Sequence, residues 1–192
     1  MKTIISTNLV QSIMAKEAFA RESSDQIVEL AKQIIETFND GGKLLIFGNG
    51  GSAADAQHMA AEFVNRFLIN RRPLPALALT TDTSVLTSIG NDFSYDLIFV
   101  KQIQALGKPE DLALGITTSG TSPNVVKGIA TARDMGLKTA ALTGGNAASG
   151  ELAGNCDLIL NVPSDSTPHI QETHLWVEHI LCEVVERAMF TS

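Results

Sequence analysis

The chain of 192 residues has few cysteines, few aromatic residues and less positive than negative charge. Its two cysteines, Cys156 and Cys182, are too few and too far apart for a disulfide framework or a thiolate zinc site, which favours a reducing, cytoplasmic location. Lys and Arg number 14 against 21 Asp and Glu, and the formal net charge is -7. A broad basic face for direct binding to nucleic acid is therefore not expected.

Long apolar runs are also missing. No segment approaches the roughly 18 apolar residues of a membrane-spanning helix, and polar residues interrupt the early stretch that could resemble an export signal. Hydrophobic residues nevertheless make up 44% of the chain and charged residues 18%, the composition of a soluble globular protein. No repeat or linker divides the sequence, so we predict a single domain over residues 1–192, with a helical arm at 1–42 and an α/β core at 43–192.

Helical periodicity predicts two helices in the arm. The first covers about residues 3–20, where apolar side chains recur every four positions. The second begins near Ser23, Ser24 or Asp25, residue types that cap helix N-termini, and ends at the Gly41–Gly42 pair. Together they form the predicted N-terminal helical arm.

After the arm, short apolar runs alternate with amphipathic segments. The apolar runs, typical of strands buried on both faces, cover residues 43–47, 76–79, 112–116, 139–142 and 158–160. Helices are predicted near residues 52–67, 95–106, 123–135 and 169–190. Alternating strands and helices indicate an α/β fold in which helices cover both faces of a parallel sheet. In such folds ligands bind outside the carboxyl ends of the strands, so the loops there are candidate sites.

A glycine-rich turn, Gly48 to Ser52, follows the first predicted strand. Glycines let backbone N–H groups approach an anion at the start of the next helix. With Ala53 the turn also fits the pattern G-x-G-x-x-A of dinucleotide sites, but the acidic residue expected about 20 positions later is missing. A turn that serves only the packing of strand against helix is the remaining alternative.

A hydroxyl-rich loop, Thr117 to Ser122, follows a later strand and precedes another helix. Ser122 with Pro123 after it is typical of a helix N-cap, and capping alone would account for one hydroxyl. The additional hydroxyls lie where the helix dipole and unpaired N–H groups point. This concentration of donors favours a phosphate site.

Polar side chains at helical spacing are candidates for proton transfer or metal binding. His58 and Glu62 lie four residues apart in one predicted helix, and Gln171 and His179 lie eight apart in the last one. Either pair is also compatible with a purely structural role. If the helices meet, the four side chains fit either a zinc site or an acid–base pair next to a sugar carbonyl.

Other polar pairs compete with these or add to them. His174 and Glu178 form a second pair on another side of the last helix, and spacing alone does not choose between the two pairs. Asn91 and Asp92 fit hydrogen bonds to sugar hydroxyls or, equally well, a turn or a helix cap.

Taken together, these features resemble the sugar isomerase (SIS) domain family and, within it, the phosphoheptose isomerases. The matching motifs are Gly48–His58 (GNGGSAADAQH), Gly90–Phe93 (GNDF), Thr118–Ser122 (TSGTS), Ala141–Gly144 (ALTG) and Ile170–Glu172 (IQE), which leads to His179. The resemblance implies a three-layer α/β sandwich, with a five-stranded parallel sheet between helices, and a homotetramer with sites shared between subunits. It also implies interconversion of D-sedoheptulose 7-phosphate and D-glycero-D-manno-heptose 7-phosphate in bacterial heptose biosynthesis, which supplies lipopolysaccharide.

The resemblance also implies roles for individual residues. Glu62 is similar to the base that moves the proton between C1 and C2, and His179 to its acid partner. The positions similar to the zinc ligands, with one zinc per subunit, are His58, Glu62, Gln171 and His179. The positions similar to substrate contacts are Asn49, Gly50, Gly51, Ser52, Glu62, Asn91, Asp92, Thr117, Thr118, Ser119, Ser122 and Gln171, with the hydroxyl-rich loop at the phosphate.

The sequence departs from the family pattern at a few positions and leaves other functions open. His169 stands where relatives commonly carry Arg, and Thr117 and Thr121 stand where they often carry Ser and Asn. The alternative functions are a non-catalytic SIS binding module, similar to the DnaA initiator-associating protein, and an isomerase of another sugar phosphate. The presence of both Glu62 and His179 favours the isomerase, since a binding module needs no matched base and acid.

Overall fold

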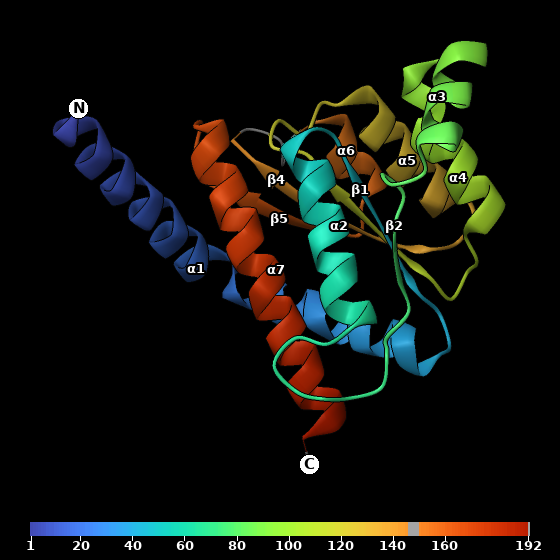
Figure 1. The fold of residues 1–192 in the computed structure, drawn as a ribbon, viewed down its shortest axis with the longest axis horizontal. Helices are drawn as coiled ribbons and strands as arrows, with labels where there is room; N and C mark the ends of the chain where they lie inside the picture. The colour runs from blue at the N-terminus through green and yellow to red at the C-terminus, as the bar shows by residue number, and fades with distance from the viewer. Residues whose placement is uncertain (146–149, 192) are drawn as a thin grey trace.

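A five-stranded parallel sheet with the strand order β2-β1-β3-β4-β5 lies at the centre of the computed structural model, which describes residues 1–145 and 150–191 (Figure 1). The strands are β1 Leu44–Gly48, β2 Ala76–Ala78, β3 Leu112–Ile116, β4 Lys138–Gly144 and β5 Leu158–Val162. Each strand coincides with a predicted apolar run, and β1 and β3 are buried along their whole length. The strand order reverses between β1 and β3, which is where α/β sheets of this kind open a ligand crevice.

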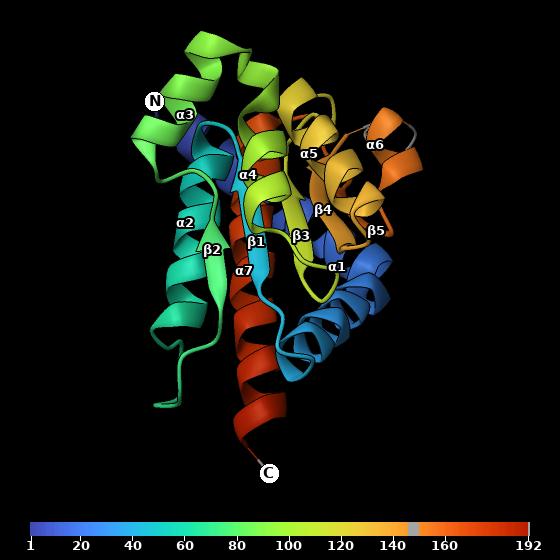
Figure 2. The same ribbon diagram turned by 90° about the vertical axis from the view of Figure 1, so that its right-hand side faces the viewer.

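Helices cover both faces of the sheet (Figure 2). The helices are α1 Lys2–Asn39, α2 Gly51–Val64, α3 Thr83–Asp92, α4 Ile98–Leu106, α5 Pro123–Asp134, α6 Glu151–Asn155 and α7 Thr167–Phe190, with the 3-10 turn η1 at Tyr95–Leu97. Helices α1, α2 and α7 pack with Leu44 and Ile46 on one face, and α4, α5 and α6 pack with Leu45 and Phe47 on the other. Because alternate side chains of a strand point to opposite faces, β1 contributes to both cores. The predicted three-layer α/β sandwich is confirmed.

The N-terminal arm differs from the prediction. Instead of two helices, residues 2–39 form the single helix α1, whose N-terminal turns extend beyond the sheet (Figure 1). Ser23 is buried and the hydroxyl of Ser24 donates a hydrogen bond to the carbonyl of Ala20, so neither serine caps a new helix. The continuous packing of α1 against α7 and β5 therefore overrides the cap signals of the sequence. Despite its 38 residues, α1 is not apolar enough to span a membrane, nor is any other helix in the described parts of the chain.

Further differences concern segments with weak periodicity. The helix predicted at 52–67 begins at Gly51 and ends at Val64. Helices α3 and α6 are absent from the prediction, because α3 is rich in Ser and Thr and has no buried residue, and α6 has only five residues. Asp82 caps α3, since its carboxylate accepts a hydrogen bond of 2.9 Å from the N–H of Val85.

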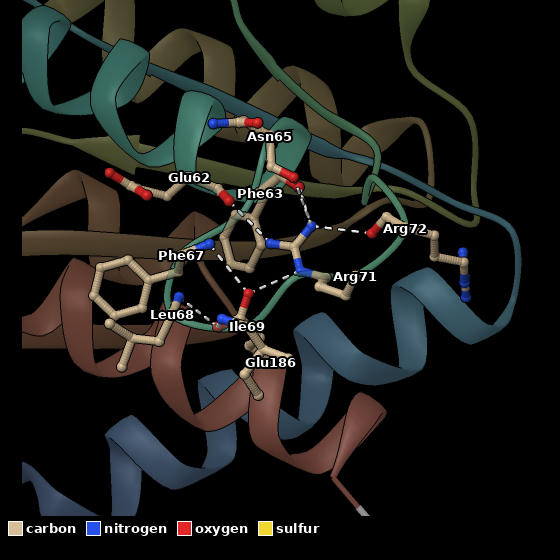
Figure 3. A network of polar contacts seen from close by, with 9 residues as sticks. All are labelled: Glu62, Phe63, Asn65, Phe67, Leu68, Ile69, Arg71, Arg72 and Glu186. Atoms are coloured by element: carbon tan, nitrogen blue, oxygen red, sulfur yellow. Dashed lines mark hydrogen bonds and ion pairs between the residues drawn. The ribbon is translucent and has the colours of Figure 1, made fainter.

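A buried ion pair holds the chain where α2 ends (Figure 3). Arg71 Nε donates to Glu186 Oε1 at 3.0 Å, and both side chains are almost fully buried. The same guanidinium donates to the main-chain carbonyls of Glu62 and Phe63, in the last turn of α2, at 2.9 and 2.7 Å. The carboxylate of Glu186 in turn accepts hydrogen bonds from the N–H groups of residues 67–69. The pair therefore caps the carboxyl end of α2 and attaches the following loop to α7.

Candidate active site

The glycine turn and the hydroxyl-rich loop lie at adjacent strand ends. In the pairing of β1 with β3, Gly48 is opposite Ile116, so the two segments that follow these residues open side by side. A Cβ on Gly48 would lie 2.6 Å from the carbonyl oxygen of Ile116, and this close approach of the strands requires glycine. Gly50 has a φ of 56°, a left-handed conformation that glycine adopts without strain, and it turns the chain into α2.

The hydroxyls of the loop after β3 bond mainly to one another. Thr117 is buried and its Oγ1 lies 3.1 Å from Ser122 Oγ. Ser119 Oγ accepts hydrogen bonds of 3.3 and 3.0 Å from the N–H and the hydroxyl of Thr121. Ser122 does precede α5, but its side chain makes no capping hydrogen bond. Capping therefore does not account for these hydroxyls, which surround the positive end of the α5 dipole.

Helices α2 and α7 lie side by side, and they bring the predicted histidines together (Figure 1). His58 Nε2 lies 2.9 Å from His179 Nε2 and 3.7 Å from Glu62 Oε1. The ring of Phe67 stacks on the ring of His179, with centroids 5.6 Å apart. The His58 side chain is 43% exposed and that of Glu62 is 25% exposed, so both are open to a ligand.

Gln171 lies next to a carboxylate that the sequence analysis did not single out. Its amide nitrogen donates to Asp55 Oδ2 at 3.4 Å. Burial raises the pKa of Asp55, although the hydrogen bond from Gln171 and the charge of His58 both act to lower it. Asp55 precedes His58 by three residues and Glu62 by seven, so all three share one face of α2. That spacing is the signal by which the sequence could have revealed Asp55.

Three of the four predicted zinc ligands, His58, Glu62 and His179, lie close together, whereas the amide of Gln171 is turned away. Zinc takes about four donors at roughly 2.0–2.3 Å. The ring nitrogens of His58 and His179 converge, but the amide of Gln171 is directed at Asp55. In residues 1–145 and 150–191, no three His, Cys, Asp or Glu side chains are arranged to hold a metal ion without a movement of side chains. A zinc site with all four ligands would therefore require the Gln171 side chain to turn from Asp55 toward the two histidines.

Other predicted pairs lie away from this cluster. Asn91 and Asp92 are exposed in the last turn of α3, where they hydrogen-bond to each other at 2.8 Å and to no other predicted site residue that the structure describes. His174 and Glu178 are buried, and His174 Nε2 lies 2.9 Å from the carbonyl oxygen of Thr143. Burial lowers the pKa of His174 to about 4 and raises the pKa of Glu178 well above its usual range. This competing pair therefore belongs to the core.

Residues from distant segments also contact the site, although sequence spacing gives no signal for them. The side chain of Asn49, in the glycine turn, hydrogen-bonds to those of Asn124 and Tyr95.

His169, at the position where the family commonly has Arg, is buried with its Nε2 3.4 Å from Asn8 Oδ1. His169 therefore attaches the start of α7 to α1.

Comparison with known proteins agrees with this fold. The model of the SIS domain family matches residues 10–144, and the chain belongs to that family. It is 48% identical over 191 residues to a phosphoheptose isomerase from Nitratidesulfovibrio vulgaris (strain DSM 19637 / Miyazaki F), which covers 100% of this chain and 91% of the relative. The resemblance predicted from the motifs is confirmed.

Two solved structures of phosphoheptose isomerases superpose on nearly the whole chain. Phosphoheptose isomerase GmhA from Neisseria gonorrhoeae is 39% identical, with a TM-score of 0.91 that covers 96% of this chain and 98% of that one. A phosphoheptose isomerase from Francisella tularensis is also 39% identical, with a TM-score of 0.92 over 96% of this chain and 97% of that one.

Proposed function

We propose that this chain is a phosphoheptose isomerase, which interconverts D-sedoheptulose 7-phosphate and D-glycero-D-manno-heptose 7-phosphate in bacterial heptose biosynthesis. The observation that carries the proposal is the meeting of Glu62, His58 and His179, in a chain 48% identical over its full length to an enzyme of that name. An aldose–ketose isomerase needs a phosphate site, a base and an acid at one crevice. The two loops and the α2–α7 contact supply candidates for all of them.

Glu62 is the proposed base and His179 the proposed acid. With the open-chain ketose bound, the carboxylate of Glu62 removes a proton from C1 while the electrons of that C–H bond form the C1–C2 double bond. The carbonyl oxygen at C2 takes up negative charge, and His179 protonates it to give the enediol. Glu62 then returns its proton to C2, while the hydroxyl at C1 gives its proton to His179 and becomes the aldehyde, which regenerates both groups.

The hydroxyl-rich loop is the proposed phosphate site. Its hydroxyls and the start of α5 offer hydrogen-bond donors and a partial positive charge without any lysine. The glycine turn, with Asn49, lies beside it and faces the rest of the sugar. The proposed substrate contacts are Asn49, Gly50, Gly51, Ser52, Glu62, Asn91, Asp92, Thr117, Thr118, Ser119, Ser122 and Gln171.

Turnover in deuterated water tests the proposal directly. Purified protein incubated with sedoheptulose 7-phosphate should form the aldose phosphate, and NMR should show deuterium from solvent at C2. The deuterium separates proton transfer by an exchangeable carboxyl from a direct hydride shift. A folded protein that turns over neither this ketose nor shorter ketose phosphates would overturn the proposal in favour of a binding module.

Zinc is part of the proposal, with His58, Glu62, Gln171 and His179 as the proposed ligands and one zinc per subunit. When bound, zinc would polarise the carbonyl group of the sugar. A metal that binds the folded state stabilises it by about 2.7 kcal/mol at 100 times its dissociation constant. We expect added zinc to raise the melting temperature above that measured with a chelator, and His58→Gln to lose this shift. Equal melting temperatures and equal rates in both conditions would contradict a role for zinc.

We also propose a homotetramer, located in the cytoplasm and built from a single domain over residues 1–192. Large apolar side chains in the first turns of α1 are exposed in the single chain, and burying them would require another surface. They are Ile4, Ile5, Leu9, Val10, Ile13 and Met14. Sedimentation of the wild-type protein measures the assembly, and a purely monomeric species at the concentrations of the assay would contradict it.

Replacing Gly51 by alanine tests whether the position of Gln171 matters. A Cβ on Gly51 would lie 1.7 Å from Gln171 Nε2, so the flexible amide must move, whereas the helical backbone accepts alanine. We expect the melting temperature to change by less than about 4 °C and kcat/KM to fall by about 10-fold or more. The matched control is Gly154→Ala in α6, where a Cβ would contact nothing within 4 Å. Unchanged kcat/KM in Gly51→Ala would remove Gln171 from the site.

A further inference from the structure

The side chains of Asn49 and Asn124 form a reciprocal amide pair between the two loops of the site. Asn49 Nδ2 donates to Asn124 Oδ1, and Asn124 Nδ2 donates to Asn49 Oδ1, both at 2.8 Å. Asn49 follows β1 in the glycine turn, whereas Asn124 lies in the first turn of α5, directly after the hydroxyl-rich loop. Asn124 is only 2% exposed. The pair therefore joins the proposed sugar-binding turn to the proposed phosphate-binding loop.

A backbone contact fixes which way both amides face. The N–H of Val125 donates both to Asn124 Oδ1 and to the carbonyl oxygen of Ser122, each at 3.0 Å. Because a backbone N–H can only donate, the atom that it meets must be the amide oxygen of Asn124. The nitrogen of Asn124 must then face the oxygen of Asn49, and the nitrogen of Asn49 must face the oxygen of Asn124. Rotating either amide by 180° would place like groups together.

Tyr95 completes the environment of Asn49. Its hydroxyl donates to Asn49 Oδ1 at 3.1 Å, so this oxygen accepts hydrogen bonds from both Tyr95 and Asn124. One N–H of Asn49 is bound to Asn124, and no other described residue hydrogen-bonds to its second N–H. The second N–H is therefore left for another acceptor near the end of β1, and a carbonyl or hydroxyl oxygen of an open-chain sugar would be such an acceptor.

We propose that Asn124 is a positioning residue, which acts through Asn49 by holding its amide so that one N–H donor faces the sugar. This inference rests on the proposed function, because it takes Asn49 as a contact of the sugar phosphate. Because Asn124 itself is buried, its proposed effect on the substrate passes through Asn49. Tyr95 supports the same orientation from the exposed side.

A double-mutant cycle on kcat/KM tests the inference. We expect Asn124→Ala to lower kcat/KM by about 10-fold. Asn124→Asp keeps the shape of the side chain but cannot donate to Asn49, so it should lower kcat/KM as well. In the Asn49→Ala background, Asn124→Ala should have less than about a 2-fold further effect, because the group that it positions is gone. A structural role alone would make the two effects multiply.

The matched control is a second cycle, in which Asn91→Ala takes the place of Asn49→Ala. Asn91 hydrogen-bonds to Asp92 and not to Asn124. The effects of Asn91→Ala and Asn124→Ala should multiply. Effects that multiply in both cycles would overturn the inference, as would wild-type kcat/KM in Asn124→Ala. Tyr95→Phe, which removes only the hydroxyl, should lower kcat/KM by roughly 2- to 3-fold and lose that effect in the Asn49→Ala background.

A second measurement keeps the inference separate from the proposed function. With asparagine labelled by nitrogen-15, the side-chain amide signal of Asn49 is identified by its loss in Asn49→Ala. We expect Asn124→Ala to speed the exchange of these amide protons with solvent, because a partly buried hydrogen bond is removed. Unchanged exchange would overturn the positioning role. An enzyme inactive on all sugar phosphates would contradict the proposed function, and this readout would still decide the role of Asn124.

Discussion

Replacing Glu62 by glutamine is expected to lower the turnover of sedoheptulose 7-phosphate by a factor of about 100 or more, with the fold intact. Glutamine has nearly the same shape, but its amide cannot take a proton from C1. The Glu62 side chain lies 3.7 Å from His58 and is 25% exposed, so the substitution disturbs no core packing. The main-chain carbonyl of Glu62, to which Arg71 donates, is unchanged in the variant.

The measurement is the steady-state rate with sedoheptulose 7-phosphate, together with sedimentation and thermal melting of the same samples. Because the interaction with the transferring proton exists mainly in the transition state, kcat should fall while KM changes little. Glu22→Gln is the matched control, since Glu22 is exposed on α1 and belongs neither to the two loops nor to the α2–α7 contact, and it should keep the wild-type rate. Wild-type kcat in Glu62→Gln would eliminate Glu62 as the base.

Replacing Glu186 by glutamine is expected to lower the free energy of unfolding by about 3–5 kcal/mol. The substitution leaves the buried guanidinium of Arg71 without its counter-charge, although Arg71 keeps its main-chain carbonyl partners. It also replaces the carboxylate that accepts hydrogen bonds from the N–H groups of residues 67–69 (Figure 3). A loss of this size is a large part of the roughly 5–15 kcal/mol by which a typical domain is stable.

Urea denaturation measures this loss of unfolding free energy, provided that the dependence of the free energy on urea concentration is the same in the wild type and the variant. Glu183→Gln is the matched control, because Glu183 lies in the same helix and pairs with Arg187 at 2.8 Å on the surface, where such a pair contributes at most about 1 kcal/mol. Equal losses in the two variants would contradict a special contribution of the buried pair. If Glu186→Gln does not fold, Arg71→Met tests the same pair from the other side.

The pH dependence supplies an independent check on Glu186. Burial alone would raise its pKa. The three backbone N–H donors and the charge of Arg71 together outweigh this effect and lower the pKa below the ordinary value of 4.5. A carboxyl with a depressed folded-state pKa stabilises the protein above the unfolded-state value, and this stabilisation is lost as the pH falls through the folded-state pKa. The difference in the free energy of unfolding between the wild type and Glu186→Gln should therefore become smaller as the pH falls below 4.5.

The sequence by itself determined the sheet, most of the covering helices and the position of both loops. Buried parallel strands are short and apolar on both faces, so β1 and β3 stand out as runs of Leu, Ile, Phe and Ala next to glycine. The glycine turn and the hydroxyl-rich loop have residue types that local backbone geometry demands or permits, as at Gly50 with its positive φ. Such signals are local, and for that reason one sequence is enough to identify them.

Only the tertiary structure decided which polar pairs face each other. Spacing within α7 allowed either His179 or His174 to face outward, and the packing of α2 and β4 placed His179 beside His58 and His174 against Thr143. The arm is a single helix for the same reason, because its packing against α7 and β5 outweighs the serine cap signals.

The contacts of Asn49 show this limit most clearly. Tyr95 and Asn124 come from η1 and α5, and no periodicity connects them with the turn after β1. Hydrogen bonds between distant segments form because packing of the whole chain brings these segments together, whereas sequence patterns report only on neighbours within about two helical turns. The sequence therefore determined which chemical groups are available, and the fold decided which of them meet.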